Sequence, residues 1–232
     1  SCIVRILHSN DIQTRDSREE TRKRAIPVND HYFFNEINWE LKAYLLGIMF
    51  SDGNVNSDRP ELSLGMSDID VVTLFRDKLG SDLKILYTKP RLSHHLPLYT
   101  VRMTSDQMKK DLIRHGCTPN KSLTLKFPTS VPEHLIRHFI RGYFDGDGSI
   151  TVTERTKKAT FTGTYDFLIS IKHYLNEFHI NCGNPNPTSG THSGNTFDLR
   201  IDRSSLYRLR LYLYEDSKFY MERKHSKFNQ LK

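Results

Sequence analysis

Two stretches of the chain, LLGIMFSDGN at residues 45–54 and IRGYFDGDGS at residues 140–149, follow one plan and decide the fold. In each, an apolar segment of helical spacing ends on an acidic residue followed by glycine, and the acids are Asp52 and Asp147. A carboxylate at a helix C-terminus is disfavoured by up to ~1 kcal/mol, because that end already carries partial negative charge. Two such ends therefore indicate that a cation is held there, and Mg²⁺ accepts carboxylate, carbonyl and phosphate oxygens as ligands.

Small residues lie on one face of each predicted helix, Gly47 with Ser51 and Gly142 with Gly146. Small residues four positions apart let two helix backbones approach closely. We therefore expect the two helices to pack on each other through these faces. The packing would bring the two acids side by side and relate two halves of the chain by a pseudo-twofold axis.

The same order of elements surrounds both stretches, namely helix, two strands, helix, two strands and helix. The elements predicted for the first half are a helix from Asn38 to the SDG at 51–53, strands at 54–56 and 61–67, a helix at 68–79, strands at 83–89 and 97–103, and a helix at 105–115. Those predicted for the second half are a helix at 131–145, a hairpin at 149–164, a helix at 165–178, a strand at 196–202 and a helix from about 203.

This duplication predicts a mixed α/β (α+β) fold of two αββαββα repeats with two antiparallel, saddle-shaped sheets. We expect a charged N-terminal arm at 1–34, a first repeat at 35–125 and a second repeat at 126–232. Two helix starts have local signals. Asn38 is a good N-cap residue, and Ser130 with Glu133 forms a capping-box pattern.

Composition favours a polyanion as partner, because 34 Lys and Arg residues outnumber 27 Asp and Glu residues and give a net charge of +7. An ordinary basic protein would have the same charge, so charge alone does not decide. No apolar run is long enough for a membrane span and no secretion signal is visible, which predicts a cytoplasmic protein. Three widely spaced cysteines give no zinc-binding pattern and suggest free thiols.

The acidic motifs have two simpler interpretations. A calcium-binding EF-hand loop needs Gly at its sixth position and Glu at its twelfth, but the second motif has Ile150 and Thr156 there, and the first has Ser57 and Ser63. A single Asp-Gly pair is most simply a helix stop and turn. Two copies, each after a small-residue helix face and before a hairpin, favour a functional site instead.

The motifs Leu45–Gly53 and Ile140–Gly148 resemble those of LAGLIDADG homing endonucleases in the single-chain, two-repeat form, and the resemblance covers about residues 35–232. It implies that Asp52 and Asp147 bind the metal, Mg²⁺ or Mn²⁺, and that Ser51 and Gly146 lend carbonyl oxygens. The sixth motif position differs between the copies, with Phe50 in the first and Asp145 in the second.

The resemblance also implies one basic catalytic residue near the end of each repeat. Lys121, in TPNKS, and Lys224, in ERKHSKF, are the candidates, because each is a polar position beside an apolar segment. A plain surface lysine is the alternative for both.

The hairpins alternate, so that one sheet face is apolar and the other carries Ser, Thr, Asn, Arg and Lys. Such a face suits base edges and phosphates, although an ordinary solvated face would look similar. The residues expected to contact DNA are Asn54, Asn56, Ser63, Lys84, Lys89, Arg91, His94, Arg102, Ser149, Thr151, Thr153, Arg155, Lys157, Lys158, Thr160, Thr162 and Arg200.

The expected function is therefore a monomeric, metal-dependent endonuclease of intron-homing type that cuts both strands of double-stranded DNA across a central minor groove at a long, asymmetric site. The alternatives are an RNA maturase or a DNA-binding regulator on the same fold that does not cut. An intein-borne endonuclease is a weaker expectation, because the chain ends FNQLK without a His-Asn pair.

Overall fold

The computed structural model describes residues 29–79, 83–90, 92, 96–188 and 196–231. The elements of the first half are α3 (Glu40–Ser51), β1 (Gly53–Val55), β2 (Glu61–Met66), α4 (Ile69–Leu79), β3 (Ile85–Thr88), β4 (Leu98–Thr104), α5 (Asp106–Arg114) and a 3₁₀ turn, η1 (Lys121–Leu123). Those of the second half are η2 (Glu133–Leu135), α6 (Ile136–Asp147), β5 (Ser149–Val152), β6 (Lys157–Gly163), α7 (Tyr165–Glu177), β7 (Asn186–Pro187), β8 (Phe197–Ile201), η3 (Arg203–Ser205), α8 (Leu206–Tyr214) and α9 (Glu222–Phe228).

The two halves have the same topology, as the duplication predicts. Each contains an antiparallel four-stranded sheet, in the order β1-β2-β4-β3 in the first half and β5-β6-β8-β7 in the second. Alternation is regular along β2, where Leu62 and Leu64 are buried and Ser63 between them is partly exposed. Helices of the same half cover the apolar face of each sheet, so the polar face stays open.

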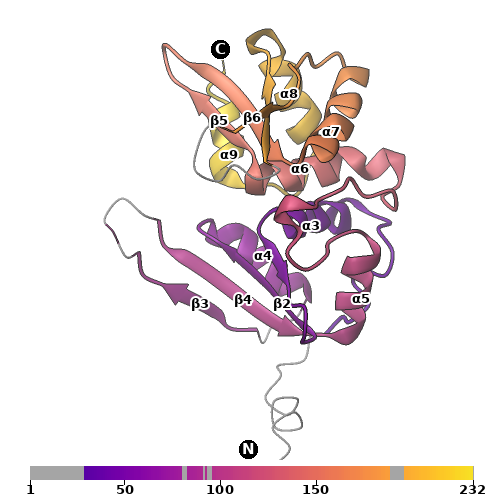
Figure 1. Ribbon diagram of the computed structural model, residues 1–232. Coiled ribbons are helices and arrows are strands. Elements are labelled where there is room, and N and C mark those ends of the chain that lie inside the picture. The colour runs from indigo at the N-terminus through magenta and orange to yellow at the C-terminus, as the bar shows by residue number, and fades with distance from the viewer. Residues whose placement is uncertain (1–28, 80–82, 91, 93–95, 189–195, 232) are drawn as a thin grey trace, which may run out of the picture.

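The helices α3 and α6 lie side by side at the centre of the molecule, with one sheet on either side (Figure 1). A Cβ atom built on Gly142 would lie 2.0 Å from the backbone oxygen of Tyr44, and one on Gly47 would lie 2.2 Å from that of Phe139. No side chain fits in either place, so only glycine permits this backbone contact. The predicted seam between the two motif helices is confirmed.

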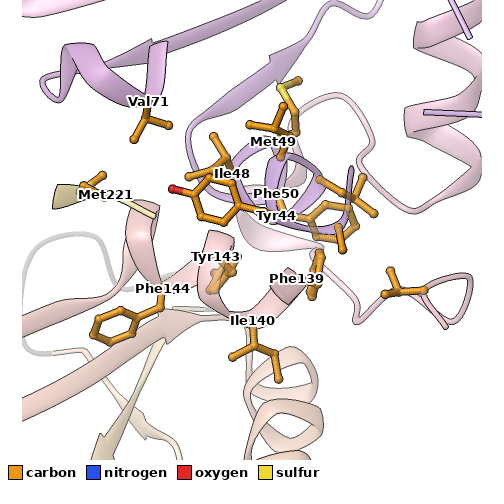
Figure 2. Close-up of a cluster of buried hydrophobic side chains, with 14 of the residues drawn as sticks. Tyr44, Ile48, Met49, Phe50, Val71, Phe139, Ile140, Tyr143, Phe144 and Met221 are labelled. Atoms are coloured by element: carbon orange, nitrogen blue, oxygen red, sulfur yellow. The ribbon is translucent and has the colours of Figure 1, made fainter. Parts of the chain in front are cut away.

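Apolar side chains from both helices fill the layer around this seam, and Figure 2 shows Ile48, Phe50, Phe139 and Tyr143 among them. The rings of Phe50 and Phe139 meet edge to face, with 5.0 Å between their centroids. One continuous core therefore joins the halves. Within the described ranges, no helix is long and apolar enough to cross a bilayer.

Both predicted helix starts are wrong. Helix α3 begins at Glu40 after Trp39, and no side chain caps it. The hydroxyl of Ser130 lies 2.6 Å from His115 Nδ1 rather than at a helix N-terminus, and a 3₁₀ turn precedes α6. At Ser130, a contact with a residue 15 positions away replaces the local cap.

Candidate active site and nucleic-acid face

The two motif acids lie at the same end of the α3–α6 pair. Asp52 is the C-cap of α3, where its N–H donates to Ile48, and Asp147 is the last residue of α6. A Cβ atom on Gly146 would lie 2.5 Å from Oδ2 of Asp52, so this carboxylate sits directly against the α6 backbone beside Asp147. The seam therefore brings the two acids together, as the sequence predicts.

The carboxylates are held where negative charge is unfavourable. Burial raises the pKa of Asp52, although Lys224, the Ser51 hydroxyl and Lys121 partly oppose the shift. Burial, followed by the nearby charge of Asp52, raises the pKa of Asp147 to about 6. Each acid would gain from a cation between them.

One oxygen of this pair has no partner. Oδ2 of Asp52 is buried and accepts no hydrogen bond from any described residue. An unsatisfied buried acceptor costs about 1–3 kcal/mol, more when it is charged. This oxygen is therefore the strongest sign in the structure that the site is built for a cation.

The donor set fits a hard divalent ion shared with substrate. No group of three or more His, Cys, Asp or Glu side chains is arranged to hold a metal among the residues that the structure describes. Two acids with neighbouring backbone carbonyls leave most positions around an ion to water and phosphate oxygens, which is the usual environment of Mg²⁺ at phosphate-processing sites. Ser51 and Gly146, the predicted carbonyl ligands, directly precede the two acids.

Each predicted catalytic lysine reaches the motif of its own half. The buried Lys121 donates from Nζ to the carbonyl of Gly53, and the buried Lys224 donates to the equivalent Gly148. Lys224 also donates to Phe144 at 2.7 Å and to Gly146 at 2.9 Å, so it caps the end of α6. Both ammonium groups are close enough to the acids to lower their pKa values.

Burial lowers the pKa of Lys224 itself to about 8, with Asp145 opposing the shift. Its ammonium group is thus held in a dry environment against α6. The carbonyl of Gly146, a predicted metal ligand, already accepts one of its hydrogen bonds and retains a second lone pair.

The sixth motif position separates the two halves, as the Phe50 and Asp145 difference indicates. The fully buried Asp145 accepts hydrogen bonds from the hydroxyls of Tyr44 (2.9 Å) and Tyr214 (2.6 Å) and from the N–H of Met221 (2.8 Å). These bonds fix the segment that enters α9 and carries Lys224. Phe50 instead packs in the aromatic layer of the seam.

A second buried network joins the halves near the middle of α6. Arg141 is fully buried and forms an ion pair with Glu40 at 2.8 Å. It also donates to the carbonyls of Phe219 (2.8 Å) and Leu213 (3.1 Å) and to Nδ1 of His138 (2.8 Å). Arg141 therefore fixes the path of the chain between α8 and α9.

The open face of the first sheet carries a cross-strand row of predicted DNA contacts. Asn54 pairs with Ser63, and Ser63 pairs with Arg102. Lys84 and Lys89 are exposed at the two ends of β3. Arg91 and His94 lie outside the described residues.

The open face of the second sheet is also basic. Ser149 pairs with Thr160, which pairs with Arg200, and the neighbouring row pairs Thr151 with Lys158. The next row on the other side contains Thr162. Ser149, Lys158, Thr160, Thr162 and Arg200 border a hollow of about 420 Å³.

Other predicted contacts have different positions. Oδ1 of Asn56 accepts from the N–H groups of Asp58 and Arg59 and shapes a turn. Thr153 closes the β5–β6 turn with Thr156, and Arg155 is exposed at its tip. Lys157 pairs with Val152, which places it on the face opposite to Lys158.

Asp198, which is not among the predicted contacts, lies on the same open face between Thr162 and the edge strand. A signal for it was present, because Asp198 and Arg200 alternate with the buried Leu199 and Ile201 in TFDLRID. Also absent from the predicted residues are Glu40, Tyr44, Arg141 and Tyr214, whose roles depend on partners far away in sequence.

Comparison with known proteins agrees with this geometry. Residues 134–213 match the LAGLIDADG-like domain family. A stretch of 164 residues is 24% identical to part of DNA-directed RNA polymerase subunit Rpo1C of Methanocaldococcus jannaschii, over 68% of this chain and 18% of that protein. The chain thus spans about a fifth of the length of this curated relative.

Solved structures share the fold at low identity. The homing endonuclease I-WcaI bound to its DNA recognition sequence matches with a TM-score of 0.56 and 10% identity over 93% of both chains. Mesophilic variants of the homing endonuclease I-DmoI match at 0.54 and 13%, over 82% of this chain and 97% of theirs. Full-length DUF199/WhiA from Thermatoga maritima matches at 0.51 and 13%, over 88% of this chain and 61% of that one. The chain therefore has the LAGLIDADG fold in its single-chain, two-repeat form, and its residues 134–213 match the LAGLIDADG-like domain family.

Proposed function

We propose that this chain is a site-specific endonuclease that cuts both strands of double-stranded DNA with the help of divalent metal ions. The observation that carries the proposal is the buried, unpartnered oxygen of Asp52 beside Asp147 at the end of the α3–α6 seam. Both halves contribute to this one site, so a single chain would act as a monomer on an asymmetric target.

The open sheet faces support DNA as the substrate. They present Asn, Ser, Thr, Lys and Arg side chains, and the whole protein has a net charge of +7. Two proteins of the same fold were solved with DNA, I-WcaI with its recognition sequence and an I-DmoI variant with its target DNA in the presence of Mn (TM-score 0.51, 14% identity, 77% of this chain and 95% of that one). We infer that the two sheets lie along the DNA on either side of the acids.

A bound Mg²⁺ or Mn²⁺ would supply a positive charge that stabilises the attacking and leaving oxygens of phosphodiester hydrolysis. Asp52 and Asp147 would hold it, with the carbonyls of Ser51 and Gly146. Lys121 and Lys224 keep their ammonium groups beside this position by donating to the ends of the motifs. There they would attract the scissile phosphates and balance the charge of the two acids.

A non-cleaving DNA-binding protein or an RNA maturase is the second candidate. Homing endonucleases and WhiA share this fold, so the fold by itself does not imply cleavage. The proposal consequently depends on the acidic site rather than on the fold. A protein that only binds nucleic acid gains nothing from two adjacent carboxylates with raised pKa values, which lower its stability and repel phosphates.

A library of randomised DNA duplexes tests the proposal. The protein is incubated with the library and Mg²⁺, and the ends produced are sequenced. We expect ends on both strands at one family of related sequences, and none with excess chelator. A protein that retains a defined sequence from the library but cuts none of it in Mg²⁺ or Mn²⁺ would be a binding protein instead.

A further inference from the structure

Asp198 is an acidic residue on a surface that is otherwise basic and neutral. It lies on β8 directly opposite Thr162 of β6, and Thr162 Oγ1 donates to its Oδ1 at 2.8 Å. This bond fixes the direction of the carboxylate on the open face. Among the described residues, its second oxygen has no hydrogen-bond or ion-pair partner.

The cations nearby do not neutralise it. Arg200 is the next residue on the same face of β8, and Lys158 borders the same hollow of about 420 Å³. Neither forms an ion pair with Asp198 in the described part of the chain. Asp198 is also the sole acid on the open face within β5, β6, β7 and β8. The carboxylate of Asp198 would repel DNA phosphates, so a favourable contact with DNA has to be with a base edge.

The major-groove edges of the bases differ in what they offer a carboxylate. Cytosine presents an N4 amino donor, whereas guanine presents two acceptors and thymine an acceptor and a methyl group. Adenine presents an amino donor next to the N7 acceptor, which repels the second carboxylate oxygen. A fixed carboxylate therefore selects cytosine.

We propose that Asp198 is a specificity-determining residue that accepts a hydrogen bond from the amino group of one cytosine in the target. This inference rests on the proposed function, because it requires the second sheet to lie in the major groove. Thr162 acts as a positioning residue, since it leaves only one carboxylate oxygen for the base.

Arg200 provides an internal reference. It lies two residues from Asp198 on the same face, a spacing of about 6.6–6.8 Å along the strand. Arginine reads guanine through two hydrogen bonds, and successive bases are ~3.4 Å apart. Arg200 would therefore set the preference at a different position, about two base pairs from that of Asp198.

The experiment is a binding selection from a randomised duplex library in Ca²⁺, followed by sequencing of the bound DNA. Wild type, Asp198→Ala, Asp198→Asn and Arg200→Ala are compared. We expect wild type to favour cytosine about tenfold at one position. Asp198→Ala should make that position neutral, and Asp198→Asn should shift it to adenine, the base that asparagine reads. Arg200→Ala should change another position and leave this cytosine in place.

Three outcomes overturn the inference. An unchanged base profile in Asp198→Ala, with wild type still selecting its target, rejects the role of Asp198 and leaves the proposed function intact. Equal strengthening of binding to all sequences in Asp198→Ala shows that the carboxylate only repels phosphates. If wild type selects no sequence at all, the proposed function fails and this inference with it. Equal melting temperatures of the four proteins would show that the open-face changes leave the fold intact.

Discussion

At the scale of single residues, the two acids have similar positions but different surroundings. Asp52 has a buried oxygen without a partner among the described residues. Asp147 is exposed at the end of α6, and its pKa is raised to about 6. Neither carboxylate is neutralised by an ion pair among the described residues, and two nearby lysines donate to carbonyls instead. The site is thus arranged so that positive charge is close, yet the acids stay free to bind it.

Metal binding should therefore stabilise the protein through Asp52. At ten times its Kd, Mn²⁺ adds about 1.4 kcal/mol to the free energy of unfolding, a rise of roughly 3–6 °C in Tm for a chain of this size. Asp52→Asn keeps the shape of the side chain but removes the charge, so its Tm should not respond. Thermal melting with Mn²⁺ or with chelator checks this, and equal Mn²⁺ shifts in both proteins would exclude Asp52 as a ligand.

At the scale of the elements, the seam depends on two glycines that have no space for a side chain. Gly142→Ala would place Cβ 2.0 Å from the Tyr44 oxygen, so the helices must move apart. We expect a loss of about 1–3 kcal/mol in the free energy of unfolding and reduced cleavage.

Gly183→Ala is the matched control, because nothing lies within 4 Å of the new Cβ. It should leave stability unchanged or raise it slightly. Chemical denaturation of both variants makes the comparison, and equal stability of the two variants would mean that the seam is not closely packed.

The network around Arg141 should make the stability of the protein depend on pH. His138 accepts from Arg141 at Nδ1 and must be neutral to do so. Burial, with Arg141 nearby, lowers its pKa to about 4, compared with ~6.5 in the unfolded chain. Between pH ~4 and ~6.5, the unfolded chain binds a proton at His138 and the folded chain does not. The stabilising contribution is therefore complete above pH ~6.5 and is lost as the pH falls toward 4.

The variant His138→Asn retains an acceptor without a titrating group. Wild type should lose stability more steeply than the variant from pH 6.5 to 4.5, by less than ~1.4 kcal/mol per pH unit because the ring is partly exposed. Urea denaturation at several pH values measures both slopes. Parallel slopes would contradict the role given to His138.

The elements also show which features were accessible from the sequence. The order of helices and strands and the glycine seam followed from periodicity and spacing, because the open sheet faces and the helix contact impose regular patterns on local sequence. The seven-residue α9 was missed, since ERKHSKF has little apolar periodicity. The start of α3 was misplaced by one residue, since Trp39 rather than Asn38 is its N-cap and no side chain caps the helix.

The polar network of the second half could not be predicted for the same reason. Asp145 was recognised as the residue that differs from Phe50, but its partners are 69, 76 and 101 residues away. The proximity of Asp52 and Asp147 could be predicted because their positions depend on the two helix ends alone.

At the scale of the whole molecule, the halves share a topology but present different surfaces. On the open face of the first sheet, Leu86 and Leu98 are 47% and 42% exposed and accompany Arg102, whereas the second sheet has Lys158, Arg200 and Asp198 there. Apolar side chains suit thymine methyl groups and charged ones suit guanine and cytosine edges. Such a pair of surfaces fits an asymmetric target.

The basic face should make binding sensitive to salt. The logarithm of the association constant should fall with the logarithm of salt concentration by ~0.9 for each phosphate neutralised. Lys158→Ala should reduce this slope by up to about one unit, whereas Lys110→Ala, on α5, should not change it. Titrations over a series of salt concentrations give the slopes, and a flat response of the wild type would exclude a long basic contact with DNA.

The central claim is that Asp52 and Asp147 form one metal-dependent site that cuts both strands. Its most direct test is cleavage in Mg²⁺ of a supercoiled plasmid that contains the selected target, for wild type and for Asp147→Asn, with gel-shift binding measured in Ca²⁺. We predict that wild type linearises the plasmid and that Asp147→Asn leaves it supercoiled or slowly nicked, while binding DNA at least as tightly. Linearisation by Asp147→Asn at the wild-type rate would contradict the account.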